Sequence, residues 1–199
     1  MKSSFSEFKE TGQMLWSGGL ISAAAGNLSV KEGSYSCPGY AIRITASGSL
    51  LGFLKREDIV KVNLDTGLTV PGQVPGSARP SVEINIHKSI YENSSYSAVA
   101  HAHPPTAIAL SYDSKEIELI DDEGKFYLPR VPVLKVSGSG ISSREVAREL
   151  PGIIRDTGLV VVEGHGVFAA AENLKKCGAL ISTLEHSALI LYRKKTFER

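Results

Sequence analysis

The sequence predicts an α/β protein in which helices pack against a mixed or antiparallel sheet. Short apolar runs typical of strands are interleaved with amphipathic helical segments, and the two kinds do not follow the strict alternation of a parallel sheet. The 199 residues suffice for one well-buried core, and 42% hydrophobic with 22% charged residues is an ordinary globular composition. We therefore expect a single domain over residues 1–199.

Alternating or wholly apolar runs predict short strands along the chain. The expected strands cover residues 28–30, 41–45, 60–64, 68–70, 96–100, 131–134 and 159–162. A turn over residues 31–40 joins the first two, and Asp65-Thr66-Gly67 makes a hairpin turn. The last run, Leu159-Val160-Val161-Val162, is wholly apolar, which is typical of a strand buried on both faces.

Apolar residues at helical spacing predict the helices. They are expected at residues 5–16, 81–92, 106–111, 142–150 and 172–195, with one helical turn at 55–59. Ser81 is expected to cap the second, and Ser142 or Ser143, with Glu145 as a capping-box acid, the fourth. Residues 112–130 are polar without a clear period, and the Gly- and Pro-rich residues 71–80 are loop.

Composition and charge exclude several classes of protein. A net charge of +1 gives no long-range attraction to nucleic acid or to an anionic membrane. No apolar run approaches the roughly 20 residues of a membrane span. The first residues do not have the form of a signal peptide, so a cytoplasmic location is expected. Cys37 and Cys177 are isolated, which argues against both a disulfide framework and a thiolate metal site.

Two histidines near the middle of the chain form the strongest chemical motif, His101-Ala102-His103-Pro104. On an extended strand, residues two apart point to the same side, whereas on a helix they lie about 200° apart. The preceding residues suit a strand, and the prolines end it. Two imidazoles therefore stand side by side at the end of a strand, as a divalent metal requires.

A third ligand is expected from His165, which follows the most apolar strand and lies between two glycines. A lone histidine is more often a satisfied core or turn residue, but the His101/His103 pair favours a three-histidine zinc site. Glu83, at the start of a helix, is either a capping acid or a catalytic group. The loops containing Asn27, the Ser47-Gly48 turn and Ser81 offer hydroxyl and N–H donors to a phosphate.

Five motifs stand together in an order and spacing that resembles the class II aldolase/adducin family over about residues 5–195, and within it the L-fuculose-phosphate aldolases. They are Gly26-Asn27-Leu28-Ser29, Ile44-Thr45-Ala46-Ser47-Gly48, Arg79-Pro80-Ser81-Val82-Glu83, His101-Ala102-His103-Pro104 and Gly164-His165-Gly166. The resemblance implies a three-layer α/β/α sandwich with a central, mostly antiparallel sheet, and a homotetramer with active sites between subunits.

By position, the resemblance assigns the ligands of one zinc ion to His101, His103 and His165. Glu83 matches the general base, which can also ligate the metal when substrate is absent. The substrate phosphate matches a further set: Asn27, Ser47, Gly48 and Ser81. The family pattern has a second serine before the acid, where this chain has Val82.

The function expected from the resemblance is a zinc-dependent aldolase. It would cleave a phosphorylated ketose of the L-fuculose 1-phosphate type to dihydroxyacetone phosphate and an aldehyde, through a metal-stabilised enediolate. The alternatives on the same fold are methylthioribulose-1-phosphate dehydration and pentulose-phosphate 4-epimerisation, and more remotely a non-catalytic adducin-like scaffold. The proton donor is left open between Tyr127, Glu123 and neither of the two. His87, four residues after Glu83 on the same helical face, either orients Glu83 or covers the surface, and the surface is favoured. His186 is expected at an interface or in solvent.

Overall fold

One seven-stranded sheet forms the centre of the molecule in the computed structural model, which describes residues 5–33, 40–70, 78–112, 114–141 and 143–197. Its order is β3-β2-β1-β4-β7-β6-β5. The strands are β1 (Asn27–Glu32), β2 (Ala41–Thr45), β3 (Ile59–Asn63), β4 (Ala98–Ala102), β5 (Val133–Leu134), β6 (Leu159–Val162) and β7 (Gly166–Ala171). Only β5 and β6 run parallel, so the sheet is mixed and mostly antiparallel, as predicted.

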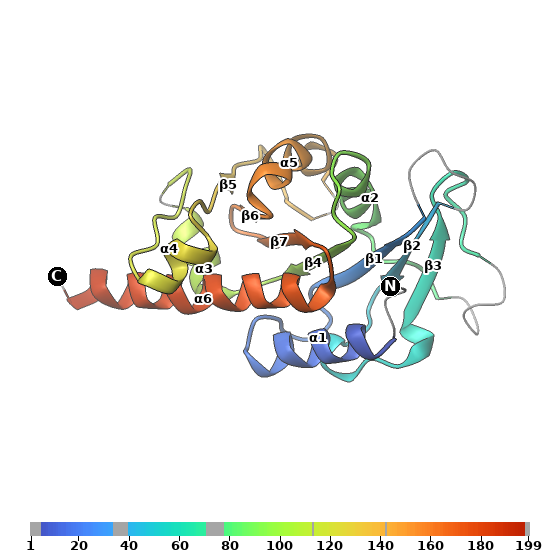
Figure 1. Cartoon of the computed structure of the whole chain (residues 1–199), viewed down its shortest axis with the longest axis horizontal. Helices are drawn as coiled ribbons and strands as arrows, with labels where there is room; N and C mark the ends of the chain where they lie inside the picture. The colour runs from blue at the N-terminus through green and yellow to red at the C-terminus, as the bar shows by residue number, and fades with distance from the viewer. Residues whose placement is uncertain (1–4, 34–39, 71–77, 113, 142, 198–199) are drawn as a thin grey trace.

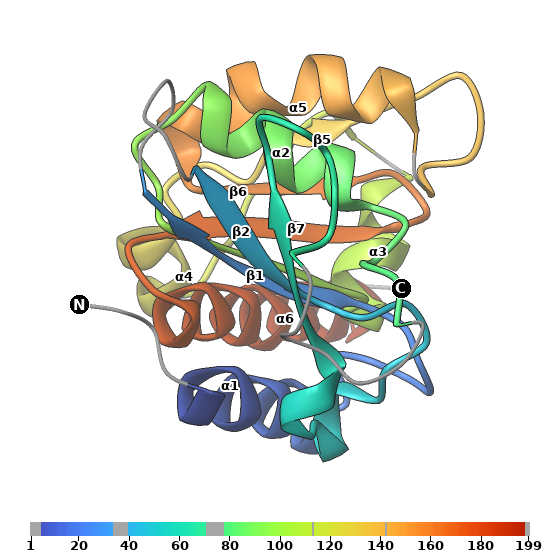
Figure 2. The ribbon, with the colours of Figure 1, turned by 90° about the vertical axis from the view of Figure 1, so that its right-hand side faces the viewer.

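Helices cover both faces of this sheet and complete a three-layer α/β/α sandwich (Figures 1 and 2). They are α1 (Phe5–Ser17), α2 (Ile84–Glu92), α3 (Pro105–Ser111), α4 (Asp122–Tyr127), α5 (Arg144–Thr157) and α6 (Leu174–Phe197), with 3₁₀ turns η1 (Leu51–Phe53) and η2 (Arg56–Asp58). The pair α2 and α5 lies on one side of the sheet, and α1 and α6 lie on the other (Figure 2). No helix in the described ranges is long and apolar enough to cross a bilayer.

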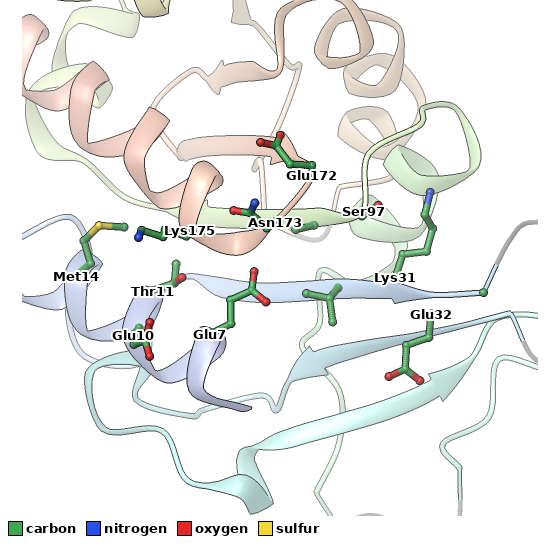
Figure 3. Close-up of a pocket in the computed structure, with 13 residues that line it drawn as sticks. Glu7, Glu10, Thr11, Met14, Lys31, Glu32, Ser97, Glu172, Asn173 and Lys175 are labelled. Carbon is green, nitrogen blue, oxygen red and sulfur yellow. The ribbon is translucent and has the colours of Figure 1, made fainter. Parts of the chain in front are cut away.

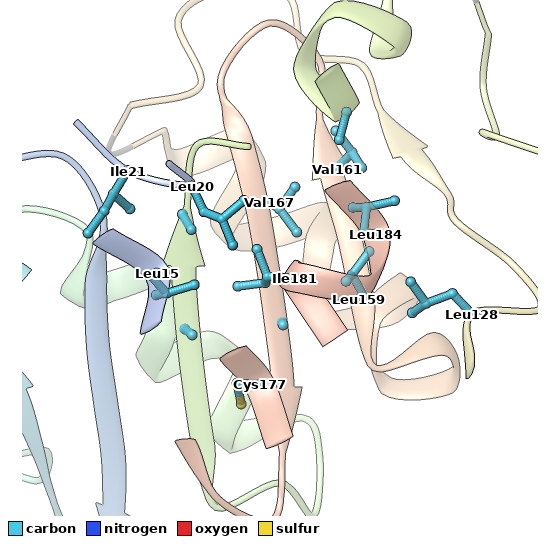
Figure 4. Packing of buried hydrophobic residues seen from close by; sticks show 14 of the residues in the cluster. Leu15, Leu20, Ile21, Leu128, Leu159, Val161, Val167, Cys177, Ile181 and Leu184 are labelled. Carbon is cyan, nitrogen blue, oxygen red and sulfur yellow. The ribbon is translucent and has the colours of Figure 1, made fainter. Parts of the chain in front are cut away.

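The sheet separates two hydrophobic cores. On one face, residues of β4, β6 and β7 pack with α1 and α6, around Leu15, Val167 and Ile181 (Figure 4). On the other, Val99 and Phe168 belong to the core beneath α2 and α5. Successive strand residues point to opposite faces, which places His101 on the α2/α5 face with these two. His101 thus projects from a buried strand rather than from a surface loop.

Several element boundaries differ from those predicted. Strand β4 begins two residues later than the predicted run that starts at residue 96, and as predicted it carries His101 near its end. Helix α2 begins at Ile84 rather than Ser81. The expected strand at 68–70 is reduced to one bridge between Thr69 and Val62. Helix α5 continues through Pro151 to Thr157.

Two elements, β7 and α4, were missed entirely. The β7 sequence is rich in alanine and buried on both faces, so it carries neither alternation nor strong strand propensity. Helix α4 begins at the N-cap Asp121, whose carboxylate accepts from the Gly124 N–H at 2.9 Å. The polar surface of this short helix hides its period.

The predicted cap of α5 is correct for one of its two candidates. The Ser143 hydroxyl accepts from the Val146 N–H at 3.3 Å. Glu145 as a capping-box acid is wrong, because its carboxylate instead accepts from the backbone N–H and the hydroxyl of Ser137. The predictions for Ser142, Cys37, loop residues 71–77 and most of the turn over 31–40 lie outside the described residues.

Candidate metal centre

Four strands of the sheet meet at one end, and the predicted site residues gather there. Strand β1 begins at Asn27, and its partner across the ladder is His101, next to the last residue of β4. Strand β6 ends at Val162, which pairs with Gly166 at the start of β7. The β6–β7 turn, which carries His165, therefore lies beside the end of β4.

The three predicted histidines come together at this end. One ring nitrogen from each of His101, His103 and His165 lies within 4.8 Å of the other two. The Nε2 atoms of His101 and His103 are 2.8 Å apart, and the ring centroids of His101 and His165 are 4.7 Å apart. As the i, i+2 spacing predicted, the first two imidazoles project from the same side of an extended segment.

Glycines make the close approach of the imidazoles possible. Gly164 adopts a φ of +64°, which favours glycine and turns the chain sharply before His165. A Cβ on Gly166 would lie 2.8 Å from ring carbons of both His101 and His103. The sequence-based expectation, that these glycines permit an unusual backbone angle and close contact, describes both positions.

Gly140 is a third such glycine and was not predicted. A Cβ there would lie 2.6 Å from Nδ1 of His165, so the backbone at Gly140 packs directly on the imidazole. The only sequence signal is the Ser-Gly-Ser-Gly run that ends at this residue. The Tyr112 hydroxyl, also not predicted, lies against Gly164.

Glu83 faces the imidazoles instead of capping its helix. It is the N-cap residue of α2 but makes no side-chain cap hydrogen bond, and it is 4% exposed. Its Oε2 lies 3.3 Å from Nε2 of His101, and its Oε1 lies 3.5 Å from Nε2 of His165. Asn27 donates from Nδ2 to the same Oε2 at 2.7 Å. The Glu83 carboxylate thus adds an oxygen ligand to the three histidine nitrogens, as a fourth possible metal ligand.

Burial keeps the imidazoles neutral. Desolvation, followed by the neighbouring imidazoles, holds the pKa of His101 well below its usual value. Desolvation also lowers the pKa of His103, and together with His103 it lowers the pKa of His165 to about 4. Nδ1 of His101 lies 3.0 Å from the carbonyl oxygen of Val167, to which it donates when Nε2 carries the lone pair. Three neutral nitrogens and one carboxylate suit a divalent transition metal.

We expect acid to destabilise the metal-free protein well above the pH at which carboxylates titrate. Burial lowers the pKa of His87 to about 3 and that of His165 to about 4, whereas unfolded histidine titrates near pH 6.5. Below pH 6.5 the unfolded chain therefore binds more protons than the folded chain. The free energy of unfolding should be level above about pH 6.5 and fall by ~1.4 kcal/mol per pH unit for each such histidine below it.

Urea unfolding of chelator-treated protein between about pH 7.5 and about pH 5 measures this dependence. The double variant His87→Gln/His165→Gln is the control, and its stability should fall less steeply over the same range, with the remaining slope due to His101 and His103. Equal slopes for the two proteins would contradict the assignment.

The expected phosphate residues lie on two adjacent loops. The Ser47 N–H donates to Arg79 O at 2.9 Å, and the Ser81 N–H donates to Thr45 O at 3.1 Å. Ser47 and Gly48 are exposed, and Gly48 has a φ of +80°. Ser81 is buried, and its hydroxyl accepts from the Glu83 N–H at 3.3 Å, which joins this loop to the start of α2. Asn27, the fourth expected member, instead bonds Glu83 through its amide.

The remaining predicted residues lie elsewhere. Glu123 and Tyr127 are exposed on α4, which packs on α6. His186 is exposed on α6, as expected. The expectation that His87 lies on the surface is wrong: it is fully buried, because α2 turns this side chain onto the sheet face that carries Ser29.

A separate cavity of about 960 Å³ lies at the other end of the sheet (Figure 3). Glu7, Thr11, Lys31 and Asn173 are among its lining residues, and none of the three histidines lines it. The Glu7 carboxylate accepts from the Leu174 N–H at 2.7 Å and so stabilises the start of α6. Glu7 therefore has a structural role at this end of the sheet.

Comparison with known proteins identifies the family. Residues 6–192 match the Class II Aldolase and Adducin N-terminal domain. An L-fuculose phosphate aldolase of Methanocaldococcus jannaschii is 32% identical over 169 residues, which cover 84% of each chain. A methylthioribulose-1-phosphate dehydratase of Acidiphilium cryptum is 30% identical over 84% of this chain and 79% of its own.

A solved structure agrees in fold as well as in sequence. The crystal structure of L-fuculose-1-phosphate aldolase from Thermus thermophilus superposes with a TM-score of 0.83 at 32% identity, covering 98% of this chain and 95% of that one. The family match, the sequence identity and the agreement in fold therefore all indicate the same family. The chain belongs to the class II aldolase and adducin family.

Proposed function

We propose that the protein is a zinc-dependent aldolase that cleaves a phosphorylated ketose of the L-fuculose 1-phosphate type to dihydroxyacetone phosphate and an aldehyde. The observation that carries this proposal is the convergence of three neutral imidazoles and one buried carboxylate at one sheet end. We assign the metal to His101, His103 and His165, with Glu83 as a further ligand when substrate is absent. The similarity to L-fuculose phosphate aldolases supports the substrate class.

A divalent ion held there supplies a Lewis acid that draws electron density toward the carbonyl oxygen of the ketose. The chain itself moves the protons. When the bond between the third and fourth carbons breaks, the hydroxyl on the fourth carbon gives its proton to the group for which Tyr127 and Glu123 are the candidates and becomes the aldehyde carbonyl. The electron pair of the broken bond stays with the ketose fragment, and Glu83 in its acid form protonates the third carbon. In the direction of synthesis the Glu83 carboxylate removes the same proton. The Asn27 amide fixes the orientation of this carboxylate.

We place the substrate phosphate over Ser47, Gly48 and Ser81, since the amide of Asn27 is engaged with Glu83. Val82 is exposed beside them and has no polar group to offer. Replacing Val82 with Ser is therefore expected to add one phosphate donor and lower KM several-fold, with little change in kcat. Steady-state kinetics checks this, and a raised KM would place the phosphate elsewhere. Val82→Thr adds the same hydroxyl while keeping the branched shape and should also lower KM, whereas Val82→Ala, which adds no donor, is the control and should not lower it.

A panel of phosphorylated ketoses tests the reaction itself. Zinc-loaded enzyme is incubated with L-fuculose 1-phosphate, L-ribulose 5-phosphate and methylthioribulose 1-phosphate, and dihydroxyacetone phosphate is measured with a coupled reductase. We expect this product from L-fuculose 1-phosphate, its loss after chelation, and its return with zinc. Loss of water from methylthioribulose 1-phosphate without carbon–carbon cleavage would instead support the dehydratase, which the similarity to the Acidiphilium enzyme favours as second candidate.

We also propose a homotetramer, on the ground of the family resemblance. Light scattering of the purified protein measures its mass against the 21.3 kDa chain. A monomer that turns over substrate would contradict an active site shared between subunits.

A further inference from the structure

A buried chain of polar groups runs behind Glu83 on the inner side of α2. His87 lies one turn beyond Glu83 and is fully buried. Its Nδ1 is 2.6 Å from the Ser29 hydroxyl, and that hydroxyl is 2.7 Å from the hydroxyl of Tyr91. The ring of Phe168 lies edge-on to that of His87, with 6.1 Å between the ring centroids. It also stacks on the ring of His101, with 4.1 Å between the centroids. The chain thus lies directly beside the metal centre.

Two polar atoms at the end of this chain are buried without a hydrogen-bond partner among the described residues. They are Nε2 of His87 and Oδ1 of Asn27. An unsatisfied buried donor or acceptor costs about 1–3 kcal/mol, so each of these two atoms requires an explanation. Nε2 of His87 can donate a hydrogen bond when it carries the ring proton, whereas Oδ1 of Asn27 can only accept one.

The fold places the two residues that carry these atoms at neighbouring positions. Asn27 and Ser29 are two apart on β1 and therefore point to the same face. Glu83 and His87 are four apart on α2 and therefore point to the same side. The hydrogen bond between Asn27 and Glu83 and that between Ser29 and His87 run side by side from strand to helix.

The direction of the hydrogen bonds follows from Tyr91. The proton of the Tyr91 hydroxyl needs an acceptor, and the Ser29 hydroxyl oxygen at 2.7 Å is within reach, so Tyr91 is best satisfied by donating to Ser29. Ser29 then donates to Nδ1 of His87, which leaves the proton of the neutral ring on Nε2. The opposite direction would leave the Tyr91 proton without an acceptor.

We propose that His87 is a positioning residue for Glu83. It donates from Nε2–H to Oδ1 of Asn27, directly or through one water molecule, and so holds the Asn27 amide with its Nδ2 toward Oε2 of Glu83. A flipped amide would set an oxygen against the carboxylate. The relay Tyr91–Ser29–His87–Asn27 therefore keeps the carboxylate aimed at the reacting carbon, an inference that rests on Glu83 acting as the proposed base.

Nuclear magnetic resonance tests the relay without any substrate. In metal-free protein with ¹⁵N-labelled histidine, we expect His87 to be neutral at pH 7, with its proton on Nε2, and we expect that proton to shift in Asn27→Ala. A proton on Nδ1, or no response to Asn27→Ala, would overturn the proposal in the wild-type fold, whatever reaction the enzyme catalyses.

Two variants of His87 test the positioning. His87→Leu removes the donor, whereas His87→Gln keeps an N–H near the position of Nε2. We expect His87→Leu to speed hydrogen exchange of the Asn27 side-chain amide at least tenfold and to lower kcat about 10–100-fold with KM and zinc content retained. His87→Gln should recover most of both losses. In the Asn27→Ala background, His87→Leu should lower kcat little further.

Equal exchange rates of the Asn27 amide in wild type and His87→Leu would overturn the positioning role. The positioning role would also be overturned if the fold-losses of kcat caused by His87→Leu and Asn27→Ala simply multiplied in the double variant. If wild type turns over no ketose phosphate, the proposed function fails, but the exchange and tautomer measurements still decide the relay.

Discussion

Replacing Glu83 with Gln is expected to lower kcat by about 10²–10⁴-fold, the range for loss of a general acid or base. The amide has nearly the same shape and keeps an oxygen for Asn27 or the metal, but it cannot carry a proton to and from carbon. Because the three imidazoles remain, the variant should still bind zinc. Stopped-flow or steady-state assay of dihydroxyacetone phosphate, together with metal analysis of the same sample, measures both quantities.

Glu163→Gln is the matched control for this change. Glu163 also lies at this end of the sheet, next to the β6–β7 turn, but its carboxylate pairs with Lys135 near the surface. Its removal should change kcat by no more than about twofold, because exposed ion pairs contribute little. Unchanged turnover in Glu83→Gln would remove Glu83 from the base role, and loss of zinc would make it chiefly a ligand.

Replacing Gly166 with Ala is expected to weaken metal binding by well over tenfold. The new methyl group would lie 2.8 Å from ring carbons of both His101 and His103 and 2.6 Å from the backbone oxygen of Ala102. Backbone cannot yield as a flexible side chain can, so one or both imidazoles must move away from the shared ion. A misplacement of about 1 Å is enough to spoil a site of this kind.

Competition with a chromophoric chelator measures the zinc affinity of Gly166→Ala. Gly152→Ala is the control, because nothing lies within 4 Å of the added methyl group and zinc affinity should be unchanged. Thermal unfolding of the metal-free variants separates a local effect on the site from general loss of the fold. Wild-type zinc affinity in Gly166→Ala would show that the ligands are not held by this contact.

The strand-end positions of the three histidines could be predicted, because they follow from the spacing and type of residues that are near one another in the sequence. An i, i+2 pair at the end of a strand must point one way, which is why His101 and His103 stand together. The wholly apolar run before His165 likewise indicated a buried strand that delivers a residue to a sheet edge. Glycine on both sides of that residue pointed to close contact, and the contact at Gly166 is with the other two rings.

The long-range part could not be predicted, because it depends on register and on which face of a helix is buried. His87 was placed on the surface, although Ile90 and Tyr91 follow it at helical spacing, because the sequence carries no sign of the buried Ser29 hydroxyl that receives it. Gly140 lies far from His165 in the sequence and touches it only in the fold. Strand β7 was missed because a strand buried on both faces need not alternate.

The metal content of wild type and of His165→Ala tests the central claim most directly. Both proteins are loaded with zinc, dialysed against metal-free buffer and measured by inductively coupled plasma mass spectrometry, with His186→Ala as the control for loss of an exposed histidine. Three converging imidazoles predict about one zinc per chain in wild type and in His186→Ala, and almost none in His165→Ala. A full equivalent of zinc retained by His165→Ala would contradict the claim that these three histidines hold one ion.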